Sequence, residues 1–165
     1  MAKRPITILG INPGSRYIGM AVFRGPELRD WRVKVIKGKW SKEKTAKALT
    51  IISGFIERYQ PKALAIKRLH RSRSSPELDR LVVKIKALSR RKGMKLREYS
   101  IEDLEACFCP GERSNKKKMA ESVASQYPVL FPELMKERSN KNPYHLRMFE
   151  AVALGARCFH YLDKH

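Results

Sequence analysis

The sequence predicts an α/β fold in which a five-stranded mixed sheet is flanked by helices. Two apolar runs near the N-terminus are separated only by a tight turn, which is typical of an antiparallel strand pair. Later short apolar runs alternate with longer segments of helical periodicity, which is typical of parallel strands joined by helices. The 165 residues are expected to form a single domain that spans residues 1–165.

The first three expected strands follow one another directly. Residues 5–11 form an apolar run that ends at Asn-Pro-Gly-Ser, and residues 17–23 resume after this turn. At hairpin distance the two runs should pair antiparallel. Residues 30–36 fit a third strand, so the sheet should begin with three antiparallel strands.

A helix and a parallel strand are expected next. Ser41 can cap a helix over residues 42–58. The apolar residues of this segment recur at spacings of three and four and should face the sheet: Ala46, Leu49, Ile52, Phe55 and Ile56. Residues 63–67 then form the short apolar run that a central parallel strand shows.

The second long helix is bounded by recognisable signals. Ser74 and Glu77 are spaced as a capping box, and Gly93 is placed as a C-terminal stop. Residues 94–99 fit a fifth strand, and Ser100 can cap a short helix after it.

The C-terminal third is predicted to hold two helices with a surface segment between them. The first helix covers residues 115–127, whereas residues 128–142 carry two prolines and several polar residues and should cross the surface. The last helix runs from residue 143 to about residue 162. One apolar stripe should pack it on the sheet: Leu146, Phe149, Val152, Ala153, Ala156 and Phe159.

The charge balance predicts an acidic polymer as the partner. The chain has 36 Lys and Arg against 16 Asp and Glu, a net charge of +20, which favours nucleic acid. No segment approaches the roughly 18 apolar residues of a membrane span, and no basic helix resembles an interfacial anchor. The N-terminal residues do not resemble a secretory signal. We therefore expect a cytoplasmic protein that does not bind membranes.

The cysteine pattern does not favour a metal site. Cys107, Cys109 and Cys158 are an odd number without a disulfide framework, which suits a reducing compartment. With His160 they number four zinc ligands, but the Cys-x-Cys and Cys-x-His spacings are not those of common zinc sites. Buried or unused thiols are the expected reading.

The first strand pair carries a family motif. ILGINPGSRYIG, residues 8–19, resembles the pattern I-x-G-I-D-P-G-S/T-x-x-x-G of RuvC-type Holliday junction resolvases. Three further stretches follow in the family order, namely ALAIKRLH, LREYSIEDLEACF and RMFEAVALG, so the resemblance spans almost the whole chain. It implies an RNase H-like fold and a homodimer that binds four-way DNA junctions. The family cuts DNA with two divalent cations held by four acidic side chains.

The residues at those four acidic positions differ from the family pattern. The resemblance places Asn12, Lys67, Arg147 and Glu150 there, so four negative charges become one net positive charge. Mg²⁺ or Mn²⁺ would meet two cations and too few oxygen ligands. The sequence therefore predicts a degenerate nuclease with no catalytic residues, no metal and no cofactor. Two interpretations of the cations stay open: Lys67 and Arg147 bind a phosphate in place of the metal ions, or Lys67 simply pairs with Glu150.

Basic residues near these positions are the candidate DNA contacts. The segment after the fourth expected strand is basic, a basic run lies at the start of the helix of residues 115–127, and one arginine lies beside the first turn. The candidate nucleic-acid-binding residues are Arg16, Lys67, Arg68, His70, Arg71, Arg73, Lys116, Lys117, Lys118 and Arg147.

The prediction from the sequence is a protein that binds branched or structured DNA without cutting it. One alternative is an active Mg²⁺- or Mn²⁺-dependent junction endonuclease in which Glu150 cooperates with Glu102 or Asp103, although acids at a helix start ordinarily serve the helix dipole. A second alternative is a basic protein that binds RNA within a ribonucleoprotein. If a homodimer forms, the helix of residues 74–93 is its natural contact, through Leu81, Val82, Val83 and Ile85, but these residues could equally face the core.

Overall fold

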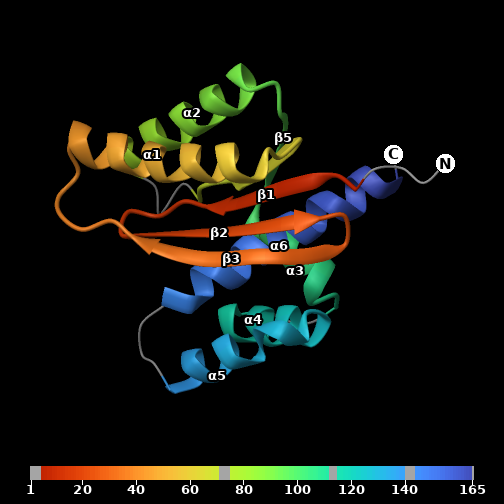
Figure 1. Cartoon of the computed structure of the whole chain (residues 1–165). Coiled ribbons are helices and arrows are strands. Elements are labelled where there is room, and N and C mark those ends of the chain that lie inside the picture. The colour runs from red at the N-terminus through yellow and green to blue at the C-terminus, as the bar shows by residue number, and fades with distance from the viewer. Residues whose placement is uncertain (1–4, 71–74, 112–114, 140–143, 165) are drawn as a thin grey trace.

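The computed structural model describes residues 5–70, 75–111, 115–139 and 144–164 (Figure 1). The strands are β1 (Thr7–Asn12), β2 (Tyr17–Arg24), β3 (Glu27–Val35), β4 (Ala63–Lys67) and β5 (Lys95–Tyr99). The helices are α1 (Lys42–Tyr59), α2 (Pro76–Arg91), α3 (Ile101–Phe108), α4 (Lys116–Gln126), α5 (Phe131–Ser139) and α6 (Tyr144–Lys164), with a 3₁₀ turn η2 (Pro128–Leu130).

The five strands form one mixed sheet in the order β3-β2-β1-β4-β5. β1 pairs antiparallel with β2, and β2 pairs antiparallel with β3. β4 lies parallel to both β1 and β5. The predicted change from antiparallel to parallel pairing is therefore confirmed, and β1 stands at the centre of the sheet.

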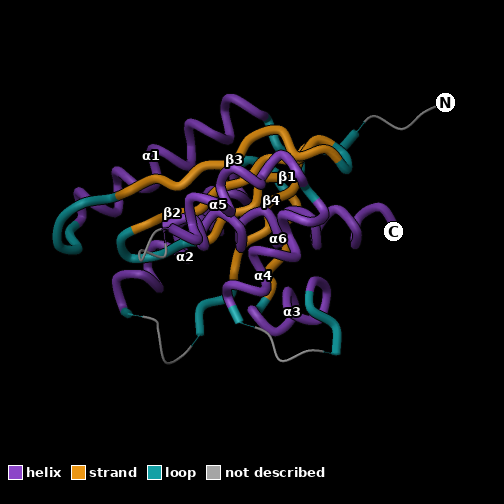
Figure 2. Tube along the Cα trace, turned by 90° about the horizontal axis from the view of Figure 1, so that it is seen from below, coloured by secondary structure: helices purple, strands orange, loops and turns teal. Residues whose placement is uncertain are grey.

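Helices cover both faces of this sheet (Figures 1 and 2). α1 and α2 pack on one face, where Leu9 and Ile11 of β1 join their apolar side chains. α6 packs on the other face with Ile8 and Phe23, and α4 and α5 lie outside it. Successive β1 side chains thus enter opposite core layers, as the period of a strand requires. No helix of the described ranges is both long and apolar enough to span a membrane.

α6 is buried more completely than the predicted single stripe. Every side chain from Met148 to Ala156 is buried, including several outside the stripe, because the sheet covers one side of α6 and α3–α5 cover the other.

The buried face of α1 differs in phase from the predicted one. Its buried residues are Lys44, Ala48, Ile52 and Ile56, which recur every four positions. Ala46 is exposed, and Leu49 and Phe55 lie half-buried at the edges of this face. The prediction counted only apolar side chains and so left out Lys44, and it chose Ala46 rather than Ala48 for the buried row.

α2 begins one residue later than predicted. Ser75, not Ser74, is the N-cap, and its hydroxyl accepts a hydrogen bond from the Leu78 backbone N–H at 3.2 Å. Pro76 fills the first helical position, where no backbone donor is needed. Leu81, Val82 and Ile85 enter the core, so of the four apolar residues named for a dimer contact only Val83 is exposed.

The segment expected to cross the surface contains helical structure that was not predicted, over residues 128–139. The 3₁₀ turn of Pro128–Leu130 leads directly into α5 over Phe131–Ser139. Both prolines lie in first-turn positions, at Pro128 of η2 and Pro132 of α5, where their missing N–H costs no hydrogen bond.

The three cysteines are free thiols, two of them buried and Cys107 exposed. Burial raises the pKa of Cys158 to about 11, which keeps it a thiol. Within the described ranges no group of three or more His, Cys, Asp or Glu side chains is arranged to hold a metal ion.

Candidate functional site

A cavity of about 750 Å³ opens at the carboxyl ends of β1 and β4. These two strands are parallel neighbours, so the segments that follow them leave the sheet at the same edge. Residues from the starts of α3 and α4 and from α6 complete the walls. All four positions named from the sequence line this cavity: Asn12, Lys67, Arg147 and Glu150.

One carboxylate oxygen of Glu150 is bound by two other side chains of the site. Lys67 Nζ lies 2.8 Å from Glu150 Oε2, and Asn12 Nδ2 donates to the same oxygen at 2.6 Å. Glu150 is only 3% exposed and Asn12 is fully buried, so these contacts are shielded from water. The ion pair that the sequence offered as one interpretation of Lys67 is present.

The side-chain amide of Asn12 takes the role of a donor. Its Nδ2 also donates to the Arg147 backbone carbonyl at 3.3 Å, so both partners of this nitrogen are oxygens. An aspartate here would bring a second negative oxygen against Glu150, whereas an amide supplies the needed N–H. Asn12 therefore suits a site that contains one carboxylate.

Three glycines of the sequence motif bring α6 to this position. A Cβ at Gly10 would overlap the Ala151 carbonyl oxygen, and a Cβ at Gly19 would overlap that of Arg147. A Cβ at Gly14 would lie 3.0 Å from the Arg147 guanidinium carbon. Because Gly10 and Gly19 lack side chains, the α6 backbone lies directly on β1 and β2, and Glu150 reaches Asn12, while Gly14 leaves room for the Arg147 side chain.

The guanidinium of Arg147 lies against the β1–β2 turn at Gly14 and lines the cavity, half-buried. Among the residues that the structure describes, no carboxylate forms an ion pair with it. Lys67 and Glu150 neutralise each other, so the charge of Arg147 is not balanced within the central group. Such a cation suits an anionic ligand.

The other predicted nucleic-acid contacts fall into four groups. Arg68, His70 and Lys116 line the same cavity. Lys117 and Lys118 are exposed on α4 without lining it, and Arg16 lines a neighbouring pocket. Arg71 and Arg73 lie outside the described residues.

Of the acids named for an alternative catalytic site, one lines the cavity and the other caps a helix. Glu102 lines the cavity, as does Glu105. Asp103 instead completes a capping box, because its Oδ2 accepts from the Ser100 backbone N–H at 2.8 Å. This hydrogen bond lowers the pKa of Asp103, so its carboxylate is already used to cap α3.

The sequence did not predict several residues that line this cavity or the neighbouring pocket. Four apolar residues line the first: Leu69, Leu78, Ile101 and Met119. Three lysines lie with Arg16 around the neighbouring pocket: Lys37, Lys39 and Lys44. The available signal was a run from Lys37 to Lys44 that holds four lysines and only one acid.

No protein-family model and no curated protein sequence matches this chain. Solved structures do match. RuvC from Thermus thermophilus, in complex with a Holliday junction substrate, aligns with a TM-score of 0.72 at 14% identity over 96% of each chain. The chain has the RuvC fold.

Two other resolvases share the RuvC fold with it. The yeast mitochondrial Holliday junction resolvase aligns with a TM-score of 0.67 at 12% identity, over 100% of this chain and 83% of its own. The fowlpox virus resolvase, in complex with Holliday junction DNA, aligns with a TM-score of 0.58 at 16% identity, over 96% and 99%. The RNase H-like fold expected from the motifs is thereby confirmed.

Proposed function

We propose that this protein binds branched DNA, four-way junctions in particular, without cutting it by a two-metal mechanism. The observation that carries the proposal is the pairing of Glu150 Oε2 with both Lys67 and Asn12. Protein donors thus occupy Oε2 of the one carboxylate that remains at the four family positions, and Lys67 offsets its charge, whereas Oε1 has no hydrogen-bond partner among the described residues.

The donor set of the site does not fit two divalent cations. Hard cations need several oxygen ligands, and paired cations need carboxylates to offset their charge. Here an ammonium group and an amide N–H face the carboxylate at 2.8 and 2.6 Å. A cation at Glu150 Oε2 would have to displace Lys67 and would still meet the charge of Arg147.

The same cavity suits a phosphate. Arg147 presents a planar guanidinium, which can donate two parallel hydrogen bonds to phosphate oxygens. Arg68, His70 and Lys116 lie around it in the same cavity and add positive or titratable side chains. The shared fold with RuvC and the fowlpox resolvase, both in complex with Holliday junctions, supports a junction as the ligand.

The test is a gel-shift and cleavage assay on a four-way junction. Purified protein should shift the junction in EDTA and leave it uncut in Mg²⁺ or Mn²⁺. Arg147→Gln should weaken binding by about tenfold or more, as expected for loss of a charge-assisted hydrogen bond. Arg157→Gln removes the same charge from the same helix outside the cavity and is the matched control.

Metal-dependent nicking that disappears in Glu150→Ala would overturn the proposal. It would favour the endonuclease alternative, which one observation supports: Glu102 and Glu105 line the same cavity as Glu150. In that case Glu102→Gln should also lose nicking. Preference for structured RNA over the junction in competition would instead favour the ribonucleoprotein alternative.

A further inference from the structure

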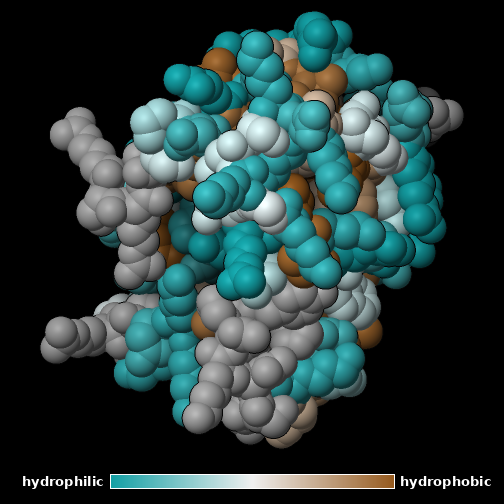
Figure 3. Space-filling view, turned by 90° about the vertical axis from the view of Figure 1, so that its left-hand side faces the viewer, coloured by the Kyte–Doolittle hydropathy of each residue, from teal (hydrophilic) through white to brown (hydrophobic). Residues whose placement is uncertain are grey.

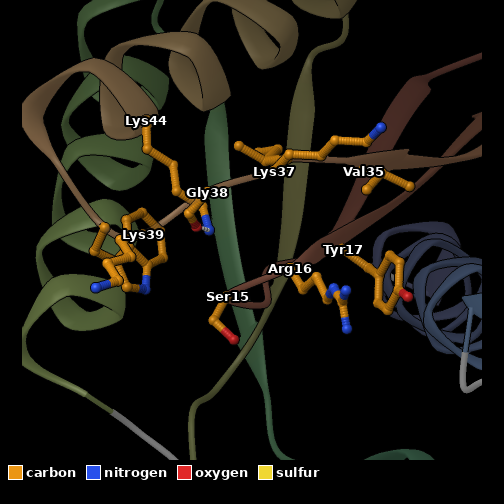
Figure 4. A pocket seen from close by; sticks show the side chains of 10 residues that line it. Ser15, Arg16, Tyr17, Val35, Lys37, Gly38, Lys39 and Lys44 are labelled. Carbon is orange, nitrogen blue, oxygen red and sulfur yellow. Dashed lines mark hydrogen bonds between the residues drawn. The ribbon is translucent and has the colours of Figure 1, made fainter.

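A second pocket, of about 840 Å³, lies on the other side of the β1–β2 turn (Figure 4). Its walls come from that turn, from the connection between β3 and α1, and from the first turn of α1. Four of its lining residues are cations, and none is acidic: Arg16, Lys37, Lys39 and Lys44. Ser15 lines both this pocket and the first cavity.

Lys44 is a buried cation in an unfavourable place. It is only 8% exposed, and its ammonium donates to the Gly38 carbonyl at 2.8 Å and lies 4.8 Å from the centroid of the Trp40 ring. It stands in the first turn of α1, where the helix dipole disfavours positive charge. Within the described residues no carboxylate pairs with it. Burial, and then the charge of Arg16, lowers the pKa of Lys44.

The pocket also contains a buried donor that is not charged. The indole N–H of Trp40 is buried and has no hydrogen-bond partner among the described residues. Figure 4 shows Lys44 reaching from α1 toward Gly38, with Ser15 and Arg16 of the turn on the opposite side. A ligand that satisfies such a pocket must bring negative charge and several acceptor oxygens, which a phosphate group does.

We propose that this pocket is a second phosphate subsite, which binds a backbone phosphate of the nucleic-acid strand that leaves the first cavity across the β1–β2 turn. Ser15 connects the two sites, and the end of the molecule that carries them is mostly hydrophilic in Figure 3. The identity of the strand rests on the proposed function, whereas the affinity of the pocket for phosphate does not.

Trp40 provides a direct reporter for the test. The chain has two tryptophans, so full-length Trp31→Phe protein leaves Trp40 as the fluorophore. It is titrated in EDTA at low salt with an octathymidylate that lacks terminal phosphates, and separately with inorganic phosphate. The oligonucleotide should change Trp40 fluorescence at concentrations at least about tenfold below inorganic phosphate, because the strand also engages the first cavity.

Two variants and one control variant test whether the cations of the pocket bind the oligonucleotide. In the Trp31→Phe background, Lys44→Met keeps the aliphatic stem and removes the charge, and Arg16→Gln alters an exposed side chain that the fold does not need. Each should weaken the oligonucleotide response by about tenfold or more. Lys47→Gln removes a lysine of α1 that lies outside the pocket, and it should leave the response unchanged.

Three outcomes would overturn the inference: no fluorescence change, an equal loss in Lys47→Gln, or saturation by inorganic phosphate without a response to the oligonucleotide. Junction shift measured in parallel separates the two proposals. If the junction binds normally to the Lys44 and Arg16 variants, the subsite is wrong and the proposed function stands. If the junction does not bind but the oligonucleotide still changes Trp40 fluorescence in the expected pattern, the subsite stands and the junction proposal fails.

Discussion

At the scale of single residues, Asn12 shows what the sequence could and could not predict. The motif around it identifies the position, and the charges of Lys67 and Glu150 make an ion pair one of two expected outcomes. That Asn12 donates to the same carboxylate oxygen depends on how closely α6 approaches β1. The approach of α6 to β1 depends on packing between segments that are far apart in the sequence; Asn12 and Glu150 are separated by 138 positions. No local sequence pattern predicts such packing.

The inference that the charges of this site exclude paired metal ions can be tested by restoring carboxylates at the four family positions. The triple variant Asn12→Asp, Lys67→Glu, Arg147→Asp places four carboxylates in the cavity. Without metal it should be less stable than the wild type, because close carboxylates repel. Mn²⁺ should raise its Tm, since a ligand at 100 times its Kd stabilises the folded state by about 2.7 kcal/mol. Thermal unfolding with and without Mn²⁺ measures both effects. An equal Mn²⁺ shift in the wild type would contradict the argument.

At the scale of elements, continuous apolar runs predicted the central strands, and apolar residues spaced three and four apart predicted most of the helices. The prediction failed where a polar residue or a proline occupies a helical position that tolerates it. Lys44 begins the buried row of α1, and Pro132 lies in the first turn of α5. Periodicity predicted that α6 packs on the sheet but not how closely, because the close approach depends on glycines that leave space rather than on side chains that fill it.

Two glycine substitutions should therefore have opposite effects. Gly19→Ala should destabilise the protein by about 1–3 kcal/mol, because its Cβ meets the α6 backbone at Arg147, which cannot move aside as a flexible side chain can. Gly54→Ala, in the interior of α1 with open space around it, should stabilise by up to about 1 kcal/mol. Urea unfolding measures both free energies. A neutral Gly19→Ala would show that α6 is not held by this contact.

At the scale of the whole molecule, the net charge of +20 predicts the class of partner but not where it binds. The structure brings cations from distant segments to the two pockets that meet at Ser15, whereas other basic residues, such as Arg90 and Arg91, complement the C-terminal end of a helix. The net charge of the chain therefore does not give the charge at the two pockets. The salt dependence of binding can show whether specific cations of the pockets or the overall charge bind the DNA.

Each phosphate contact releases condensed counterions, so for duplex arms the logarithm of the junction association constant should fall linearly with the logarithm of salt concentration, by roughly 0.9 per contact. If Arg147 and Arg16 each bind a phosphate, Arg147→Gln and Arg16→Gln should each reduce this slope by roughly 0.9, and the double variant by about twice that. Arg157→Gln, which lowers the net charge equally, should leave the slope unchanged. Fluorescence anisotropy of a labelled junction at several salt concentrations gives all four slopes. Equal reductions in all single variants would mean that diffuse charge, rather than the two pockets, holds the DNA.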